Sequence, residues 1–336
     1  MGATKGIVVR KRGYPLLDQI ASFIQGHDHF AVSTHVTPDG DALGSALATY
    51  WMLKRLGKQA VVVMHDAVPR NLDFLPGCEH VIRPHELDEE QYEQVILVDC
   101  GSSKRVGKTL HNQFKGRFTI NIDHHCDNPR FGSLHYVREL ASTTMVLDEL
   151  REAIGLPLDQ EVATCLYTGL VTDTGSFCNA SVDETVLSAA TRWVHAGVDP
   201  HFVAQNAFER QSWNEVQLQA YALSSMQREQ GIIWCALPYD VFERFHLTPH
   251  DTDRLVSQLR AIEGGEVAVL FKEIDHDLVK VSFRAKGELS VNAIAQHFGG
   301  GGHVRAAGCL LEGPMNTVVQ SVLDQVRLRL TPLLQR

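Results

Sequence analysis

The sequence predicts an α/β protein with a parallel sheet flanked by helices in its N-terminal part and a smaller α/β domain in its C-terminal part. Strand-like apolar runs recur at 29–35, 60–64, 94–99 and 118–122, and helix-like segments lie among them. Such alternation is typical of a parallel sheet covered by helices. A chain of 336 residues is also long enough for two domains that each bury a core.

The pattern changes twice after the last of these strands. From about 142 to 229 it is mainly helical, and Ser181 with Glu184 forms a candidate capping box for a helix that Gly197 can close. Strand-like runs return at 231–238, 265–275 and 278–287, and helix-like segments at 251–262, 291–298 and 315–334. We expect a hairpin around Asp275 to Asp277. The predicted organisation is a domain at 1–185, a helical linker at 186–225 and a domain at 226–336.

Composition narrows the class of protein. An apolar fraction of 44% and a charged fraction of 21% are ordinary for a globular protein. No apolar run is long enough to span a bilayer, and the start, MGATKGIVVRKRGYP, lacks a secretory signal. The seven cysteines include no C-x-x-C pair, which favours reduced thiols. We therefore expect a cytoplasmic protein without membrane contact.

The net charge of −9 bears on the partner. It is unfavourable for a protein that grips long duplex nucleic acid through many phosphates. It is compatible with a short anionic substrate whose charge is met by metals and a few local cations.

Three candidate ligands lie within seven residues of one another, in "VSTHVTPDGDALGSALA" (32–48). His35 follows a predicted strand, and Asp39 and Asp41 lie where a helix that ends at Gly57 begins. Helix capping would explain one aspartate. It gives no role to His35, so a metal site is the stronger interpretation.

Further candidate ligands follow other predicted strands and one helix. Asp99 ends the strand in "QVILVDCGS", the triplet Asp123, His124 and His125 ends the strand in "FTINIDHHCDNPRFG", and Asp173 interrupts a helical pattern in "LYTGLVTDTGSF". An oxygen-rich set with a few imidazoles and no thiolate suits manganese or magnesium, with cobalt or iron possible. Four or more converging aspartates need a pair of cations, an arrangement used in phosphoryl transfer.

These four segments resemble the four ordered motifs of the DHH phosphoesterase superfamily. Residues 281–308, "VSFRAKGELSVNAIAQHFGGGGHVRAAG", are similar to the nucleotide-binding motif of the DHH-associated C-terminal domain. The combination most resembles the bifunctional oligoribonuclease and pAp phosphatase subgroup, the nanoRNases, and its relatives that degrade cyclic dinucleotides. The resemblance covers nearly the whole chain, and it implies an active site in a cleft between the two domains.

The resemblance also implies roles for individual residues. The implied ligands are His35 and Asp39 for one manganese ion, Asp41, His124 and Asp173 for the other, and Asp99 as a bridge between both. A bridging water, deprotonated by the pair, would be the nucleophile. Asp123 would orient a neighbouring histidine. His125 would steady the scissile phosphate or donate a proton.

The glycine-rich segment before His303 is the candidate substrate-binding site. Either it is a flexible turn, or its successive N–H groups form an anion-binding nest that a phosphate or base can approach closely. Arg284 supplies a fork suited to phosphate, and His303 supplies a further donor. The candidate substrate-binding residues are Ser282, Arg284, Gly300, Gly301, Gly302 and His303.

The expected function is a manganese-dependent phosphoesterase, with magnesium or cobalt as alternative metals. It would hydrolyse short RNA of about two to five nucleotides and linear dinucleotides to nucleoside 5′-monophosphates, and pAp to AMP. The alternatives are a cyclic-di-AMP or pApA phosphodiesterase, a pyrophosphatase or exopolyphosphatase, and an exonuclease of the RecJ type. From another class, an inactive nucleotide-sensing module also fits. Relatives often dimerise, so a homodimer is a further expectation from the resemblance.

Overall fold

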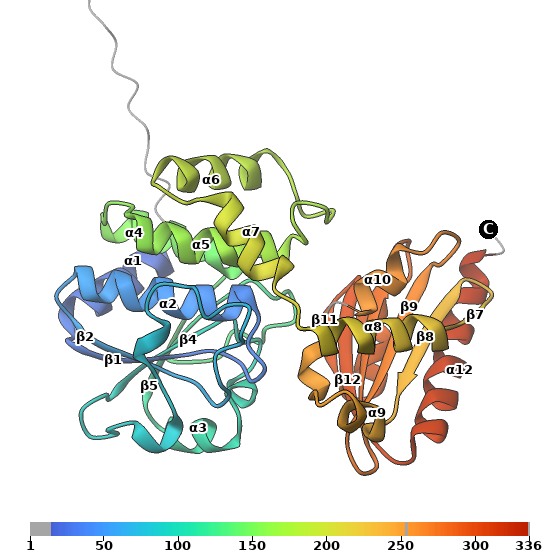
Figure 1. Ribbon diagram of the computed structural model, residues 1–336. Coiled ribbons are helices and arrows are strands. Elements are labelled where there is room, and N and C mark those ends of the chain that lie inside the picture. The colour runs from blue at the N-terminus through green and yellow to red at the C-terminus, as the bar shows by residue number, and fades with distance from the viewer. Residues whose placement is uncertain (1–14, 253–254, 335–336) are drawn as a thin grey trace, which may run out of the picture. The chain divides into compact units, whose positions relative to one another are not determined.

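The computed structural model describes residues 15–252 and 255–334, so the chain's first fourteen residues lie outside it. The chain divides into two compact units, Met1–Glu209 and Arg210–Arg336 (Figure 1). The predicted α/β class is confirmed in both units. Within the described residues, no helix combines the length and apolar character that crossing a membrane requires.

The first unit contains a six-stranded sheet in which every pair of neighbours is parallel. Its strands are β1 (His29–Ser33), β2 (Gln59–Val63), β3 (Val81–Ile82), β4 (Gln94–Val98), β5 (Phe118–Asp123) and β6 (Leu134–Val137). The four strands predicted from apolar runs are β1, β2, β4 and β5. The other two strands, β3 and β6, are not predicted by an apolar run; they are short and lie at the two edges of the sheet.

Helices cover both faces of this sheet. They are α1 (Pro15–Gly26), α2 (Gly40–Arg55), α3 (Lys108–Gln113), α4 (Thr143–Ile154), α5 (Gln160–Asp173), α6 (Glu184–His195) and α7 (Pro200–Glu209). Figure 1 shows α2, α4 and α5 on one face and α3 on the other. Phe30 and Val32 of β1 pack in the core on the first face, whereas Ala31 packs in the core on the second. Burial on both faces explains why the strands read as continuous apolar runs.

The strand order β3-β2-β1-β4-β5-β6 determines where a site can form. The chain runs outward from β1 to β3, and then returns to pair β4 with the other side of β1. At such a reversal the loops after the two central strands diverge and leave a crevice at their carboxyl ends. The residues that follow β1 and β4 therefore meet at this edge.

The second unit contains a mixed six-stranded sheet of order β11-β12-β10-β9-β8-β7. Its strands are β7 (Gln227–Glu229), β8 (Ile232–Leu237), β9 (Val267–Asp275), β10 (Leu278–Ala285), β11 (Gly301–His303) and β12 (Ala306–Glu312). Its helices are α8 (Trp213–Ser225), α9 (Tyr239–Arg244), α10 (Leu255–Ala261), α11 (Val291–His297) and α12 (Met315–Leu334). The predicted hairpin is confirmed, since β9 and β10 pair antiparallel around Asp275 to Asp277.

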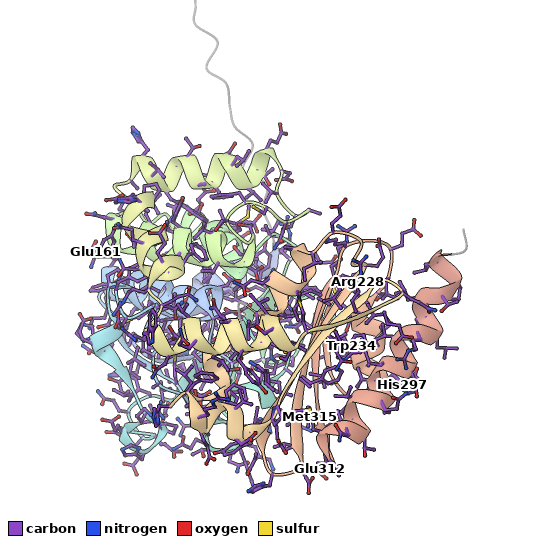
Figure 2. All side chains as sticks on the ribbon, turned by 45° about the vertical axis from the view of Figure 1, so that its right-hand side comes forward. Glu161, Arg228, Trp234, His297, Glu312 and Met315 are labelled. Atoms are coloured by element: carbon purple, nitrogen blue, oxygen red, sulfur yellow. The ribbon has the colours of Figure 1, made fainter. Side chains whose placement is uncertain are left out.

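Two cores lie on the opposite faces of this second sheet. Trp234 of β8, labelled in Figure 2, packs in the same cluster as Val322 and Val326 of α12. The neighbouring residues Ile233 and Cys235 pack on the other face with Leu218 of α8. Side chains that alternate along β8 therefore belong to different cores, as the pleat of a strand requires.

The segment expected to be a helical linker is helical, and its helices are divided between the two units. Trp193 of α6 is fully buried in the core of the first unit, and Val203 of α7 packs there as well. Leu218 of α8 packs in the second unit instead. The boundary between the units follows Glu209, where α7 ends.

Candidate active site

Two of the predicted ligands flank the strand reversal. His35 lies just after β1, and Asp99 directly follows β4. Ligand atoms of His35, Asp39 and Asp99 all lie within 4.8 Å of one another. Asp39 is also the N-cap of α2, and its Oδ1 accepts a hydrogen bond from Ala42 N at 3.0 Å. Asp39 therefore both caps α2 and belongs to this group of candidate ligands.

Asp99 lies between two imidazoles. Its Oδ2 is 3.4 Å from His35 Nε2, and its Oδ1 is 3.7 Å from His124 Nε2. The residue is buried and has a φ of 53°, a left-handed conformation that aspartate and asparagine adopt more readily than most side chains. The hydroxyl of Thr143 donates to Oδ1 at 2.9 Å. The two carboxylate oxygens of Asp99 therefore face two different groups of ligands.

The second group consists of Asp41, His124 and Asp173, whose ligand atoms also lie within 4.8 Å of one another. Asp41 is in the first turn of α2, and Asp173 is the last residue of α5. The N-terminus of α4 fixes Asp41, because Thr143 N donates to Oδ2 at 2.7 Å and Thr144 N donates to Oδ1 at 3.1 Å. Backbone amides at a helix N-terminus are well suited to hold a carboxylate.

The hydrogen bonds of His35 and His124 show which ring nitrogen each histidine could offer to a metal. His35 donates from Nδ1 to Val36 O at 2.8 Å, and His124 donates from Nδ1 to Leu140 O at 3.0 Å. A neutral imidazole that donates from Nδ1 presents a lone pair at Nε2. Here Nε2 faces carboxylate oxygens at 3.4–3.8 Å, which is longer than an ordinary hydrogen bond. Lone pairs that face carboxylates fit a divalent cation between them.

The pKa values of Asp41 and Asp99 are shifted in opposite directions. Burial and the nearby negative charge of Asp99 raise the pKa of Asp41 well above its usual value. Burial also acts to raise the pKa of Asp99, but the contact with His35 and the charges of the surrounding imidazoles outweigh it and hold that pKa well below its usual value. A buried cluster with this charge distribution is stabilised by bound cations.

Asp123 lies at the end of β5 and contacts the last member of the triplet. Its Oδ1 accepts a hydrogen bond from His125 Nδ1 at 2.8 Å, and its Oδ2 accepts one from Asn128 Nδ2 at 2.6 Å. Burial alone would lower the pKa of His125. The hydrogen bond to Asp123 and the charge of Asp99 outweigh burial and raise that pKa to about 9. His125 is thus a candidate proton donor, and Asp123 orients it.

Sequence reasoning missed two residues that support this arrangement. Thr143 contacts both Asp41 and Asp99, and Asn121 of β5 donates to Leu97 O at 3.3 Å and Cys100 O at 3.2 Å. The segment that contains Thr143 could be read as a helix start, because Ser142 is a favourable N-cap. Nothing in that pattern indicates which distant carboxylate the helix would hold.

In the second unit, strand register brings the candidate substrate-binding residues to one face of the sheet. Arg284 of β10 pairs with Ala306 of β12, which pairs with His303 of β11. Directly paired residues project their side chains to the same side of a sheet. Two residues before Arg284 on β10, and therefore on the same face, Ser282 pairs with Gly308 of β12. Arg284 and His303 therefore flank a floor made of small residues.

The glycines before His303 have packing roles that the nest interpretation did not anticipate. A Cβ at Gly300 would lie 2.1 Å from the carbonyl oxygen of Gly308, and one at Gly302, where φ is 132°, would lie 2.6 Å from that of Ala306. Gly301 and Gly302 belong to β11, and the N–H of Gly300 donates to Ala295 O at 2.8 Å. The segment is a closely packed edge strand, neither a flexible turn nor a continuous anion nest.

Carboxylates and imidazoles clustered at the carboxyl edge of a parallel sheet are suited to metal-assisted hydrolysis of phosphoesters. Residues 29–170 match the DHH family, N-terminal domain, and residues 236–330 match the DHHA1 domain. The chain belongs to the DHH family, and it is a hydrolase of the phosphoesterase type.

Relatives along nearly the full length support this assignment. A protein of Thermus thermophilus named bifunctional oligoribonuclease and PAP phosphatase NrnA is 36% identical over 94% of this chain and 94% of its own length. A Bacillus subtilis protein of the same name is 27% identical over 84% of this chain and 89% of its own. A crystal structure described as an exopolyphosphatase-related protein from Bacteroides fragilis superposes with a TM-score of 0.86 at 25% identity, covering 96% of this chain and 98% of its own.

Proposed function

We propose that this chain is a manganese-dependent phosphoesterase that hydrolyses short oligoribonucleotides and linear dinucleotides to nucleoside 5′-monophosphates, and pAp to AMP. The names of the relatives from Thermus thermophilus and Bacillus subtilis support these substrates. The observation that carries the substrate class is the pairing of Arg284, Ala306 and His303 across three strands, because it places a cation and a further donor on one face of the sheet beside small residues.

The first unit supplies the groups for hydrolysis. We assign His35 and Asp39 to one cation, Asp41, His124 and Asp173 to the other, and Asp99 to both. When bound, such a cation pair activates water and neutralises charge on the phosphate. Magnesium or cobalt could replace manganese at these oxygen and nitrogen ligands.

His125 would act on the phosphate directly. Asp123 accepts a hydrogen bond from His125 Nδ1, so the ring is held with Nε2 as its other polar atom. A protonated ring would neutralise charge on the scissile phosphate, or would deliver a proton from Nε2 to the leaving oxygen. Asp123 itself would orient the ring.

The test is hydrolysis of a substrate panel by the purified protein with manganese present. The panel contains RNA of two to ten nucleotides, pAp, linear pApA and pGpG, cyclic di-AMP and pyrophosphate. We expect the fastest turnover for the shortest RNAs and pAp, with nucleoside monophosphates as products. Turnover of pyrophosphate alone would contradict the assignment of the second unit, and tight nucleotide binding without turnover of any compound would indicate a sensing module.

Arg284→Ala tests the substrate-binding face. Loss of a charged hydrogen-bond donor to phosphate should raise KM for pAp roughly 10- to 100-fold with manganese binding unchanged. Lys280→Ala is the matched control, because Lys280 is a cation on the same strand and the same face, four positions away. Equal effects of the two substitutions would show that only general positive charge matters.

A further inference from the structure

The turn that carries the first ligand group has an unusual backbone. Thr37, between His35 and Asp39, has a φ of 52°. A left-handed conformation is unfavourable for a β-branched residue and persists only where the surrounding structure imposes it. The neighbours of Thr37 must therefore hold this turn against its own preference.

The carboxylate of Asp66 holds the strained residue. Asp66 follows β2, the strand next to β1, and its Oδ2 accepts a hydrogen bond from Thr37 N at 2.5 Å. The adjacent residue Val36 donates its N–H to Arg105 O at 2.7 Å. Two successive amides of the turn are thus bound by groups from two other segments of the first unit.

Asp66 is in turn fixed by the residue before it. His65 Nδ1 donates to Asp66 Oδ1 at 2.9 Å. The ring of His65 packs closely against Gly107, where a Cβ would lie 2.7 Å from His65 Cδ2 and 3.0 Å from Val36 Cγ1. Gly107 has a φ of 90°, so both its conformation and the space beside it require glycine. The packing of His65 therefore sets the direction in which Asp66 points.

We propose that Asp66 is a positioning residue that holds Thr37 in the left-handed conformation, so that His35 and Asp39 converge on one cation. Among the described residues, Asp66 is not a member of either candidate ligand group. If Asp66 is removed, Thr37 relaxes to an extended conformation and changes the direction of the chain immediately before Asp39. This inference rests on the proposed function in one respect, namely that His35 and Asp39 hold a cation.

The effect should be confined to one of the two cations. Asp41, in the second group, is held instead by the amides of Thr143 and Thr144 at the start of α4. Loss of Asp66 therefore leaves the second group in place. A general loosening of the fold would instead weaken both groups.

The experiment measures manganese binding to the full-length protein by isothermal titration calorimetry, with electron paramagnetic resonance as a second readout of paired and single ions. The variants are Asp66→Ala, Asp66→Asn, and Asp66→Ala combined with Thr37→Gly. Asp88→Ala is the matched control, since Asp88 likewise accepts backbone N–H bonds from its own loop, those of Glu90 and Gln91.

We expect Asp66→Ala to weaken one of two sites about 10- to 100-fold, the usual cost of losing a residue that orients a ligand. Asp66→Asn keeps an oxygen acceptor and should stay within a few-fold of the wild type. Glycine adopts the left-handed conformation freely, so Thr37→Gly should restore most of the lost affinity. Asp88→Ala should leave both sites unchanged.

Three results would overturn the inference: unchanged binding in Asp66→Ala, equal weakening of both sites, or no restoration by Thr37→Gly. A wild-type protein that binds no manganese would contradict the proposed function instead. The two hypotheses therefore fail through different measurements.

Discussion

At the scale of single residues, the site depends on groups that hold the ligands as much as on the ligands themselves. His35 and His124 each donate from Nδ1 to a backbone carbonyl, which directs Nε2 toward the carboxylates. Asp99 accepts from Thr143, and Asp41 accepts from the amides of α4. The fold itself therefore holds these candidate ligands in place.

Asp99→Asn should abolish hydrolysis without unfolding the protein. Asparagine tolerates the left-handed conformation at φ 53° and has nearly the same shape, so the substitution changes mainly the charge. Since loss of an outer residue alone costs about 10- to 100-fold, loss of the shared ligand should lower kcat by more than about 100-fold. Steady-state kinetics on pAp with a parallel thermal melt measures both quantities, and substantial remaining activity would exclude Asp99 as the bridge.

Thr143→Val should weaken cation binding, because it leaves Asp99 Oδ1 without its hydroxyl donor in a buried site. We expect about a 10-fold loss of manganese affinity by calorimetry, with Thr143→Ser close to the wild type. Thr168→Val is the control, since the Thr168 hydroxyl is also buried but donates only to Thr164 O of its own helix. If the control shows the same loss, the effect belongs to the buried hydroxyl in general and not to Asp99.

Single residues also show where sequence reasoning stops. Asp99 and Asp123 could be found because each ends an apolar strand, and a parallel sheet brings strand ends together. Thr143 and Asp66 could not be found in this way. Their importance arises from contacts with residues 44 and 29 positions away in the chain, and no local pattern encodes such a contact.

At the scale of elements, helix starts and short strands differ most from expectation. Ser181 was predicted to cap α6, but the N-cap is Asp183, whose carboxylate accepts from Thr185 N and Val186 N. Both residue types are good caps, and the local sequence does not rank them. The segment of β11 was interpreted as a flexible turn or an anion-binding nest, and glycine has a low strand propensity. The strand forms since β12 lies beside it and glycine permits the close approach.

The attachment of α6 to the first unit is open to test. Asp148 of α4 is buried and binds Arg151 Nε at 2.7 Å and Arg192 Nη2 of α6 at 2.9 Å. Asp148→Ala leaves the buried Arg151 without this partner and should lower the free energy of unfolding by about 3 kcal/mol. Glu152→Ala removes the exposed partner of the same arginine and should cost less than about 1 kcal/mol. Urea unfolding of both variants measures the difference, and equal effects would contradict it.

At the scale of the whole molecule, the two units carry different chemistry. The first holds His35, Asp39, Asp41, Asp99, His124 and Asp173, the proposed cation ligands, and the second holds Arg284 and His303. The α/β class of both units could be predicted from the alternation of patterns. The order of the strands could not, because it depends on which apolar runs pair rather than on their sequence.

Removal of metal should therefore affect the first unit selectively. At a manganese concentration of 100 times Kd, each occupied site stabilises the unit that binds it by about 2.7 kcal/mol. Hydrogen exchange should show manganese-dependent protection at the amides of Thr143 and Thr144, which hold Asp41, and chelation should reverse it. AMP without metal should instead protect residues 282–308. Equal protection of both units by manganese alone would contradict this separation.

The central position of β1 has a consequence for folding kinetics. β1 pairs with β2 after a crossover through α2, whereas Val32 pairs with Ile96 of β4, which lies 64 positions further along the chain. Long-range pairing of this kind is slow because the entropy of loop closure is lost before the contact is gained. His35 and Asp99 come together only when this pairing is complete. During refolding, the binding of manganese will therefore lag behind the formation of helices. The rate at which manganese binds will then report the rate at which β1 and β4 pair.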